Sequence, residues 1–439
     1  MKNNIAIIGL GYVGLTLAIS LAKVGFRVLG IERNKNNVKS LLNGKAHFYE
    51  ENLDKDLKKI LNTGKLKISS SLDYVKEYQI IFVTIGTPIN KNRKAELKNL
   101  FQICKKLNKI LKDKSIVALR STVMLNTCLK IEKILNKKNK LIYVASCPER
   151  TVEGSALKEI HNLPQIIASN SKVVKKRLGN IFKKITKTII HFDHANQGEF
   201  LKLIDNSWRD TTFGYANELA KIGEFYNINV IDIIKKIKIK YPRSSIPLPG
   251  TVGGPCLTKD SHILIQSVKK INLPIIYSAR NTNENFPKII IDLIKSKIQQ
   301  PIKNVLFCGL SFKGIPKTDD LRGSMAIPII KYFSKKFEKA RIDCLDNQVS
   351  EKDSRANIEF INFYSNFEKI KKKYDIIILL NNNPYWKKIG LKKLKNYLKN
   401  KDKNYIFDYW SNFNENEDNY FAIGAGKIFN KNTKFIKKN

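Results

Sequence analysis

A cysteine in a glycine-rich loop is the residue of this sequence with the clearest chemical potential. The stretch PGTVGGPCLTKD (249–260) places Cys256 after two glycines and a proline, and Asp260 follows four residues later. Glycine and proline favour tight turns and let another molecule approach the backbone closely. A structural cysteine is usually found among apolar neighbours, so this setting indicates a thiol that is presented for reaction. The next residues, SHILIQSVKKI (261–271), predict a helix after the loop.

A second chemical pattern, GLGYVG (9–14), lies between an apolar strand (5–8) and a helical segment (15–25). In a G-x-G-x-x-G turn the first glycine allows the turn, the second lets a pyrophosphate approach, and the third permits close helix packing. An acid about twenty residues on, here Glu32 at the end of the next strand, hydrogen-bonds a ribose 2′-OH and repels a 2′-phosphate. The pattern therefore predicts NAD rather than NADP. The residues of the turn expected to contact it are Gly9, Gly11, Tyr12, Val13 and Gly14.

The two patterns together predict a two-step oxidation. NAD removes a hydride, so the substrate is expected to be an alcohol or an aldehyde. A thiolate that adds to an aldehyde gives a thiohemiacetal, which loses a second hydride to become a thioester that water hydrolyses to an acid. Alcohol to acid is a four-electron change and needs two NAD for each substrate molecule.

Composition limits the alternatives. The chain has 439 residues, 80 basic against 38 acidic residues and a formal net charge of +42. The basic residues are scattered over every predicted helix face without a nucleic-acid reader motif, so we expect no nucleic-acid partner. No window reaches the ~18 uncharged apolar residues of a membrane span. Six cysteines without a C-x-x-C pair indicate reduced thiols and a cytoplasmic protein, and the five histidines give no metal-ligand spacing.

Strands and helices alternate near both ends of the chain, and a mostly helical stretch separates the two regions. Strand-helix-strand order implies a parallel sheet with its ligand at the carboxyl ends of the strands. We therefore predict the α/β class, with two Rossmann-like doubly wound domains joined by a central helical domain. The predicted boundaries are 1–195 for the NAD-binding domain, 196–298 for the helical domain with the Cys256 loop, and 299–439 for the second Rossmann-like domain.

In order along the chain, the motifs resemble those of the nucleotide-sugar 6-dehydrogenases, the UDP-glucose and UDP-N-acetylhexosamine dehydrogenases that make UDP-uronic acids. The resemblance implies NAD as cofactor, a UDP-sugar bound by 299–439, and a homodimer or higher homo-oligomer with its contact in the helical domain. The stretches that carry it are GLGYVG (9–14), IGTP (85–88), RSTV (120–123), CPERTVEG (147–154), GEFLKLIDNSWRD (198–210), PGTVGGPCLTKD (249–260) and FKGIPKTDDLRGS (312–324).

The resemblance also implies roles for single residues. Cys256 matches the thiol nucleophile and Asp260 the acid that assists it. Lys202 and Asn206, four apart on one helix face, match the pair that holds the reacting oxygen. The other matches are Glu149 for thioester hydrolysis, Thr122 near the nicotinamide and water, Thr87 in the cofactor-side turn, Arg322 as a cofactor contact and Lys313 as a UDP-sugar contact.

Plainer interpretations stay open for three of these residues. A lysine on an amphipathic helix usually faces solvent, and only the pattern from Glu199 to Asn206 distinguishes Lys202. Glu149 could be an acid at a helix start that accepts backbone hydrogen bonds. Asp260 could cap the helix after the loop.

Three departures from UDP-glucose enzymes resemble the N-acetylhexosamine branch: Arg150 after the P-E pair, the form of the Cys256 loop, and GIPK in the third motif. Arg150 is a candidate for the acetamido-bearing sugar. Arg209 and Arg243 are further candidates for the sugar nucleotide, and Arg243 matches a loop arginine that reaches a neighbouring subunit's site in this family. UDP-GlcNAc and UDP-ManNAc differ only at C2, and the sequence leaves both open.

We therefore predict an NAD-dependent oxidation of the C6 hydroxyl of a UDP-N-acetylhexosamine to the UDP-aminouronic acid, for a surface polysaccharide. UDP-glucose 6-dehydrogenase is the alternative of the same class. A one-step hydroxyacid dehydrogenase would not need Cys256 and would release one NADH for each substrate molecule. A basic polyanion-binding protein with an inactive dehydrogenase fold is the alternative of another class, and its binding would fall steeply with salt.

Overall fold

A computed structural model describes residues 4–137, 140–268, 270–298, 300–358, 362–413 and 417–428. The chain divides into two compact units. The first comprises Met1–Asn206 and His262–Asn272, and the second Ser207–Ser261 and Leu273–Asn439. Each unit is built around its own parallel sheet.

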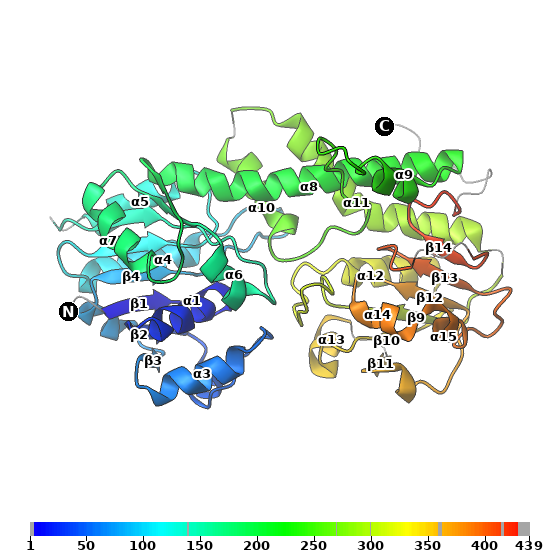
Figure 1. Cartoon of the computed structure of the whole chain (residues 1–439), viewed down its shortest axis with the longest axis horizontal. Coiled ribbons are helices and arrows are strands. Elements are labelled where there is room, and N and C mark those ends of the chain that lie inside the picture. The colour runs from blue at the N-terminus through cyan, green and yellow to red at the C-terminus, as the bar shows by residue number, and fades with distance from the viewer. Residues whose placement is uncertain are drawn as a thin grey trace. The chain divides into compact units, whose positions relative to one another are not determined.

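The first unit holds a sheet with the strand order β3-β2-β1-β4-β5-β6-β7-β8 (Figure 1). Neighbouring strands run parallel except β6 and β7, which are antiparallel. The order of the first six is that of a dinucleotide-binding fold, with a crossover from β3 back to β4 beside β1. The strands are β1 Asn4–Ile8, β2 Arg27–Ile31, β3 Leu66–Ser69, β4 Ile80–Val83, β5 Ile116–Leu119, β6 Tyr143–Ser146, β7 Gln165–Ala168 and β8 Ile189–Phe192.

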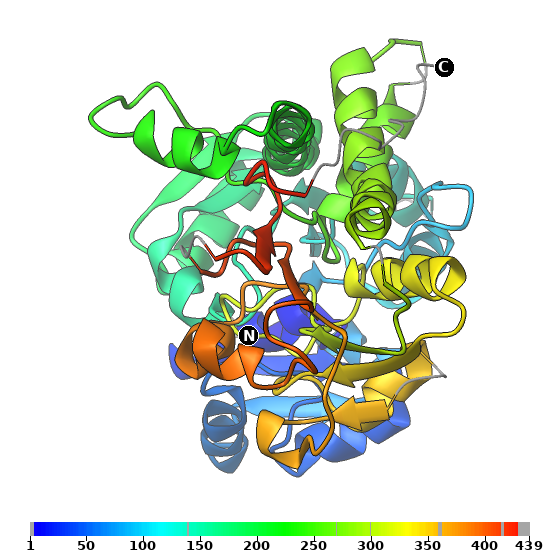
Figure 2. The same cartoon turned by 90° about the vertical axis from the view of Figure 1, so that its right-hand side faces the viewer.

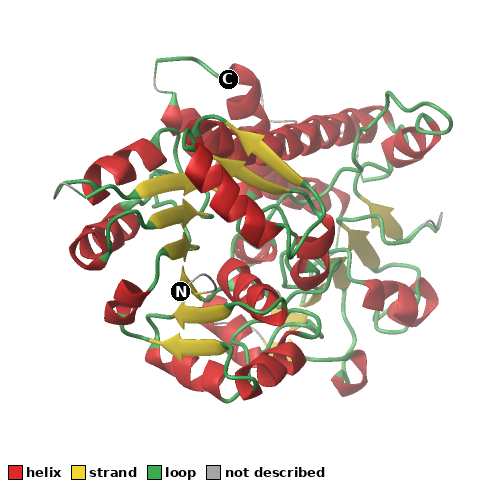
Figure 3. Ribbon diagram, turned by 60° about the vertical axis from the view of Figure 1, so that its left-hand side comes forward, coloured by secondary structure: helices red, strands yellow, loops and turns green. Residues whose placement is uncertain are grey.

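Helices cover both faces of this sheet, because its strands are apolar on both sides. Along β1, Ile5 and Ile7 pack into one buried cluster with α1 and α7, whereas Ala6 and Ile8 pack into another with α4 and α5. Such doubly buried strands are typical of parallel sheets. The helices are α1 Tyr12–Lys23, α2 Lys35–Leu42, α3 Leu53–Asn62, α4 Lys98–Ile110, α5 Thr127–Leu135, α6 Ala156–Asn162 and α7 Lys172–Phe182, with a 3₁₀ turn at Leu72–Glu77 (Figure 3).

The second unit repeats this arrangement with the strand order β11-β10-β9-β12-β13-β14, all parallel. Helix α12 packs on one face and α14 with α15 on the other (Figure 2). The elements are β9 Asn304–Cys308, α12 Ala326–Lys336, β10 Arg341–Leu345, α13 Glu351–Asn357, β11 Asn362–Tyr364, a 3₁₀ turn at Phe367–Lys369, β12 Ile376–Leu379, α14 Pro384–Ile389, α15 Leu391–Lys395, β13 Tyr405–Asp408 and β14 Tyr420–Ala422.

Four helices lie between the two sheets in the chain: α8 Ala195–Tyr226, α9 Val230–Lys236, α10 Leu257–Ser267 and α11 Pro274–Lys297. The predicted fold class, two Rossmann-like domains with a helical region between them in the chain, is confirmed. The predicted start of the helix after the Cys256 loop is wrong, because α10 begins at Leu257 and not at Ser261. Within the described ranges, none of the helices is both long and apolar enough to cross a bilayer.

Candidate active site

The predicted site residues divide between the two units. The first contains the glycine turn, Thr87, Thr122, Glu149, Arg150, Lys202 and Asn206, and the second contains Arg209, Arg243, Cys256, Asp260, Lys313 and Arg322.

The glycine turn joins β1 to α1. Gly9 has φ +98°, which favours glycine. A Cβ atom at Gly14 would lie 1.8 Å from the Gly9 carbonyl oxygen, so only glycine fits the first turn of α1. The Thr84 hydroxyl donates to that same oxygen at 2.6 Å and ties the turn to the end of β4. Glu32 follows β2, and its carboxylate accepts the Leu10 N–H at 3.2 Å.

Gly11 differs from the other two glycines of the motif. A Cβ atom built there would meet no atom of the described chain within 4 Å. It precedes Tyr12, the first residue of α1, and the first N–H groups of a helix have no acceptor inside the helix. Open space at the positive end of a helix fits the pyrophosphate of NAD.

Replacing Gly11 with alanine is expected to weaken NAD binding and leave the fold intact. The new methyl group has room within the chain but occupies the space that a pyrophosphate needs. We expect the dissociation constant of NAD to rise by about tenfold or more, equivalent to ~1.4 kcal/mol. Isothermal titration calorimetry measures this change, and the thermal unfolding midpoint, expected to stay within about 2 °C, is its control. Unchanged affinity would show that the pyrophosphate does not approach Gly11.

Two predicted threonines follow strands on the same side of the turn. Thr87 comes after β4 and is buried, and Thr122 comes after β5 and is partly exposed. Since β1, β4 and β5 are adjacent and parallel, their carboxyl ends lie at one edge of the sheet. The sheet thus brings Thr87 and Thr122 to the edge that carries the glycine turn.

Glu149 follows β6 and forms a buried ion pair with Arg120, which follows β5. Its Oε1 accepts the N–H groups of Arg150 at 2.8 Å and Thr151 at 3.0 Å. Arg120 also donates to Gln165 Oε1 at 3.0 Å. Burial by itself raises the pKa of Glu149, but the charge of Arg120 and the hydrogen bonds to the carboxylate lower it below its usual range. Glu149 is therefore ionised at neutral pH.

The Glu149 loop meets helix α8. Arg150 Nε lies 3.3 Å from Asp205 Oδ2, and Asp205 stands between Lys202 and Asn206 on the helix. Lys202 is partly exposed and Asn206 is buried. The Arg150–Asp205 ion pair therefore brings the Glu149 loop to the part of α8 that carries Lys202 and Asn206.

The same helix is anchored to the loop that carries Thr122. The buried Glu199 carboxylate accepts the N–H groups of Asn126 and Cys128, each at 2.6 Å. Glu199 belongs to the pattern that distinguishes Lys202. Its place in that pattern has a structural reason, because it fixes α8 against the start of α5.

Cys256 differs from the other cysteines of the chain. All six lie in the described residues, and Cys256 is partly exposed while the other five are buried. Burial raises the pKa of Cys104 and of Cys147 to about 12, so these thiols stay protonated. The Cys256 carbonyl accepts the N–H of Asp260 at 2.9 Å, which places Cys256 at the N-terminus of α10. A helix N-terminus favours an anion such as a thiolate.

Asp260 lies within the first turn of α10 and not before it. Its side chain is fully buried, and its Oδ1 is 2.6 Å from Lys259 Nζ. Two of the predicted catalytic residues, Cys256 and Asp260, therefore sit on one turn of one helix.

The Cys256 loop is interlocked with the loop between β9 and α12. The Gly254 N–H donates to the Gly323 carbonyl at 2.8 Å, and Gly254 has φ +96°. A Cβ atom at Gly254 would lie 2.7 Å from the Phe312 ring, so glycine is required there. Lys313 follows Phe312, and its Nζ lies 5.2 Å from the centre of that ring.

The predicted arginines of the second unit are exposed. Arg322 is held by Asp320, with Nη2 2.7 Å from Oδ2 and Nε 3.0 Å from Oδ1. Arg209 lies on α8. Arg243 lies between α9 and α10, and its guanidinium is 4.8 Å from the centre of the Tyr241 ring.

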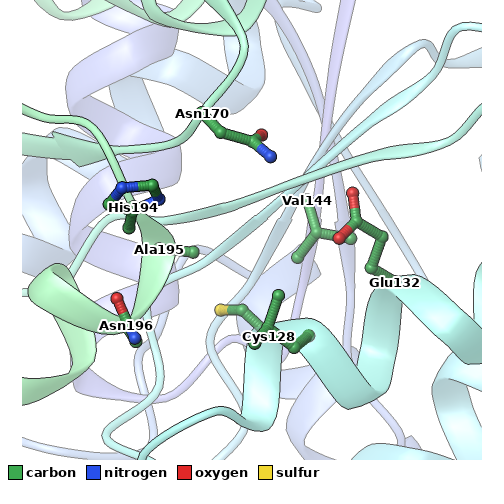
Figure 4. A pocket seen from close by; sticks show the side chains of 8 residues that line it. Cys128, Glu132, Val144, Asn170, His194, Ala195 and Asn196 are labelled. Carbon is green, nitrogen blue, oxygen red and sulfur yellow. The ribbon is translucent and has the colours of Figure 1, made fainter.

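A small cavity of about 90 Å³ lies among α5, β6 and the start of α8 in the first unit (Figure 4). Its polar and titratable lining residues are Cys128, Glu132, Asn170, His194 and Asn196. It contains none of the predicted site residues, and burial keeps the pKa of Cys128 well above its usual range.

Family models match three consecutive parts of the chain. They describe the NAD binding domain (3–186), the central domain (196–285) and the UDP binding domain (306–415) of the UDP-glucose/GDP-mannose dehydrogenase family. The chain belongs to this family. It is an NAD-dependent UDP-sugar dehydrogenase, and its NAD-binding part contains the glycine turn described above.

Named relatives cover most of the chain. UDP-N-acetyl-D-mannosamine dehydrogenase of Methanocaldococcus jannaschii is 30% identical over 90% of this chain and 88% of its own length. The enzyme of the same name from Campylobacter jejuni is 30% identical over 75% of this chain and 83% of its own. A solved UDP-D-ManNAc dehydrogenase from Pyrococcus horikoshii superposes with a TM-score of 0.84 at 26% identity, covering 97% of this chain and all of that one.

Proposed function

We propose that the protein oxidises the C6 hydroxyl of a UDP-N-acetylhexosamine to the carboxylate, with Cys256 as the covalent nucleophile. The observation that carries this proposal is the setting of Cys256, a partly exposed thiol on a glycine loop at a helix N-terminus in a chain whose other cysteines are buried. A dehydrogenase that stopped at the aldehyde would not need such a thiol.

The proposed chemistry balances with two equivalents of cofactor and one water molecule. NAD, when bound, accepts one hydride from C6 in each oxidation. The first oxidation turns the alcohol into an aldehyde and releases the hydroxyl proton. The sulfur of Cys256 then adds to the aldehyde carbon, and loss of the second hydride leaves a thioester. Water breaks the carbon–sulfur bond, which releases the acid and returns the thiol.

We assign the remaining steps of the reaction to the predicted site residues of the two units. Lys202 and Asn206 hold the reacting oxygen, and Lys202 stabilises it when it carries negative charge. Glu149, ionised at neutral pH, accepts a hydrogen bond from the water that hydrolyses the thioester, with Thr122 beside it. Asp260, on the same helical turn as Cys256, assists the thiol.

We assign the binding contacts in the same way. The glycine turn, Glu32, Thr87 and Arg322 hold NAD. Arg150, Arg209, Arg243 and Lys313 contact the sugar nucleotide. The exposed positions of Arg209 and Arg243 leave their guanidinium groups accessible to a ligand.

The sugar is proposed from the relatives and from Arg150. Several relatives are named UDP-N-acetyl-D-mannosamine dehydrogenase, which favours an acetamido sugar over glucose. Arg150 is oriented by Asp205 and supplies a donor where an acetamido carbonyl could bind. UDP-ManNAc and UDP-GlcNAc remain the two candidates, and UDP-glucose is the alternative. The product would supply a surface polysaccharide.

A substrate panel tests the proposal. Purified protein is incubated with NAD and, in turn, UDP-ManNAc, UDP-GlcNAc, UDP-GalNAc and UDP-glucose, and NADH is followed by its absorbance. We expect turnover with an N-acetylated sugar and little with UDP-glucose. Turnover confined to UDP-glucose would contradict the proposed N-acetylated substrate. One NADH for each sugar molecule would contradict the thioester chemistry.

We also propose a homodimer formed through α8. Large apolar side chains recur at spacings of seven, eight and four residues along one helix, which is the spacing of a helix–helix contact. Their exposed fractions run from 44% to 66%, high for side chains of this size. These side chains are Phe200, Trp208, Tyr215, Ile222 and Tyr226.

Replacing Trp208 with glutamate is expected to dissociate this dimer. Trp208 is 61% exposed within one chain, and a charge buried in a two-fold interface faces its own copy. We expect the dimer dissociation constant to rise about 100-fold or more, equivalent to ~2.7 kcal/mol. Analytical ultracentrifugation measures it, with Lys221→Glu on the same helix as a control for added charge. An unchanged molar mass at every concentration would contradict the contact.

The compartment and the domain boundaries remain proposals. Six free cysteines are consistent with a reducing compartment such as the cytoplasm. We retain 1–195, 196–298 and 299–439 as the proposed NAD-binding, helical and UDP-sugar-binding domains.

A further inference from the structure

A buried asparagine on α8 holds Gly250, near the start of the Cys256 loop. The Asn217 Nδ2 donates to the Gly250 carbonyl at 3.0 Å, and its Oδ1 accepts the Gly250 N–H at 2.9 Å. One side chain thus satisfies both backbone groups of one residue, as a neighbouring strand would. Asn217 is fully buried, so its amide is fixed by these bonds and not by water.

The same amide joins a polar network that reaches the other end of the loop. Asn217 Nδ2 also donates to Asn283 Oδ1 at 2.9 Å, and Asn283 Nδ2 donates to Asp210 Oδ1 at 2.8 Å. Asp210 Oδ1 accepts from Arg280 Nη1 at 2.8 Å, and that nitrogen also donates to the Leu257 carbonyl at 2.7 Å. Leu257 is the residue after Cys256.

A close approach of two helices makes this network possible. Asp210 and Asn217 are seven residues apart on α8, and Arg280 and Asn283 are three apart on α11, so each pair lies on one helix face. Between them, a Cβ atom at Gly214 would lie 3.0 Å from the Cα of Ala279. The four side chains are each at most 1% exposed. The hydrogen bonds between these buried side chains favour a single geometry.

The network therefore holds the loop on both sides of the sulfur. Gly250 is fixed through Asn217, and α10 is fixed through Leu257 and through Ser261, whose hydroxyl donates to Asp210 Oδ2 at 2.8 Å. Only five residues separate Gly250 from Cys256, so we expect a displacement of Gly250 to move Cys256 as well. None of these bonds lies on the cysteine itself.

We propose that Asn217, acting through Gly250 and the Asn283–Asp210–Arg280 network, is a positioning residue that sets the place of the Cys256 sulfur for attack on the aldehyde. This inference rests on the proposed function of Cys256. It assigns to α8 and α11 the task of making the thiol effective in the second oxidation. The first oxidation needs no sulfur and should depend little on Asn217.

The test is Asn217→Asp, which keeps the size of the side chain and the acceptor for Gly250 N–H. It replaces Nδ2 by an oxygen that faces two acceptors, Gly250 O and Asn283 Oδ1. We expect kcat to fall about 100-fold, with the KM values for NAD and the UDP-sugar within about threefold. The NADH yield should shift from two toward one for each sugar, and a hydrazine added to the assay should trap the aldehyde.

Alkylation of the thiol gives a readout that needs no turnover. The other cysteines are buried, so labelling by iodoacetamide under native conditions reports on Cys256. We expect the rate to fall about fivefold in Asn217→Asp, because the displaced sulfur leaves the N-terminus of α10. If the parent protein reduced no NAD with any UDP-sugar, the proposed function would fail while this comparison would still test the loop.

Two further variants complete the experiment. Asn285→Ala removes an exposed α11 side chain whose hydrogen bonds to described residues stay within its own helix, so it should match the parent in every assay. Asn217→Ser, a milder change, is measured alongside in case the aspartate variant does not fold. Parent-like alkylation and NADH yield in folded variants would overturn the proposal. The proposal would also be overturned if the rates of both oxidations fell equally, in proportion to the unfolded fraction of the protein. Failure of both Asn217 variants to fold would overturn it as well.

Discussion

Replacing Cys256 with serine is expected to lower formation of the acid by about 10⁴-fold or more, the scale seen when a covalent nucleophile is removed. Serine is nearly the same size, but its hydroxyl is a far weaker nucleophile than a thiolate at neutral pH. The first oxidation does not use the sulfur. The variant should therefore still bind NAD and UDP-sugar and should release no more than one NADH for each sugar. Stopped-flow absorbance of NADH and mass spectrometry of the sugar product measure both effects.

A neighbouring substitution controls for disturbance of the loop. Thr258→Ser keeps the hydroxyl that donates to the Gly254 carbonyl at 2.8 Å and should leave the reaction unchanged. Acid produced by Cys256→Ser at the parent rate would remove the thiol from the mechanism. The chain would then be a dehydrogenase of the same family with a different route to its product.

The second large effect is expected on stability. Arg120 and Glu149 form an ion pair in which the arginine side chain is 0% and the glutamate 7% exposed. Arg120→Met leaves the Glu149 carboxylate buried without its cation. We expect the free energy of unfolding to fall by about 3–5 kcal/mol, the usual loss when one partner of a buried pair is removed. Urea unfolding followed by circular dichroism measures it.

The double variant Arg120→Met, Glu149→Gln separates charge from packing. Removing both charges should recover part of the loss, because the buried carboxylate is then replaced by a neutral amide. Arg177→Met, at a partly exposed arginine of the same unit, should change stability by about 0.5 kcal/mol or less. An equal loss of unfolding free energy at both arginines would mean that the buried ion pair contributes no more to stability than an arginine outside it.

The pair also predicts how stability depends on pH. The folded pKa of Glu149 is lowered, so its contribution is present above pH 4.5, the ordinary value, and is lost as the pH falls through the lowered value. The parent should lose stability over this acid range. In Arg120→Met, burial without the cation should raise the pKa of Glu149. Ionisation of this carboxyl group should then lower the stability of the variant as the pH rises.

Local patterns in the sequence predicted the parts of the fold that local physics controls. The glycine turn after β1 follows from Gly9, which needs positive φ, and from Gly14, where a Cβ atom would collide with the turn. The second sheet follows from the same strand and glycine order near 303–314. Both doubly wound sheets and the family itself, recognised from its motifs, are confirmed.

Local sequence patterns did not predict contacts between distant segments. Arg120 belongs to the RSTV motif, and a charged residue directly after the apolar strand β5 is a signal of a buried partner. Nothing local indicates that Glu149, 29 residues on, is that partner. Likewise, Asn217 and Gly250 are 33 residues apart, and only the approach of α8 to the loop pairs them.

The start of α10 shows the limit of reading a loop by composition. Gly253, Gly254 and Pro255 indicated an extended loop up to Asp260, and the helix was expected to begin at Ser261. The structure begins α10 at Leu257, because Leu257 to Ser267 contain neither glycine nor proline, the two residues that most disfavour a helix interior. Asp260, considered as a cap, is therefore part of the first turn.

The central claim is that one protein removes four electrons from C6 through a Cys256 thioester. The most direct measurement is the amount of NADH formed for each molecule of UDP-N-acetylhexosamine consumed at completion, with the sugar product identified by mass spectrometry. The account predicts two NADH and the UDP-aminouronic acid. One NADH with an accumulated aldehyde would contradict it.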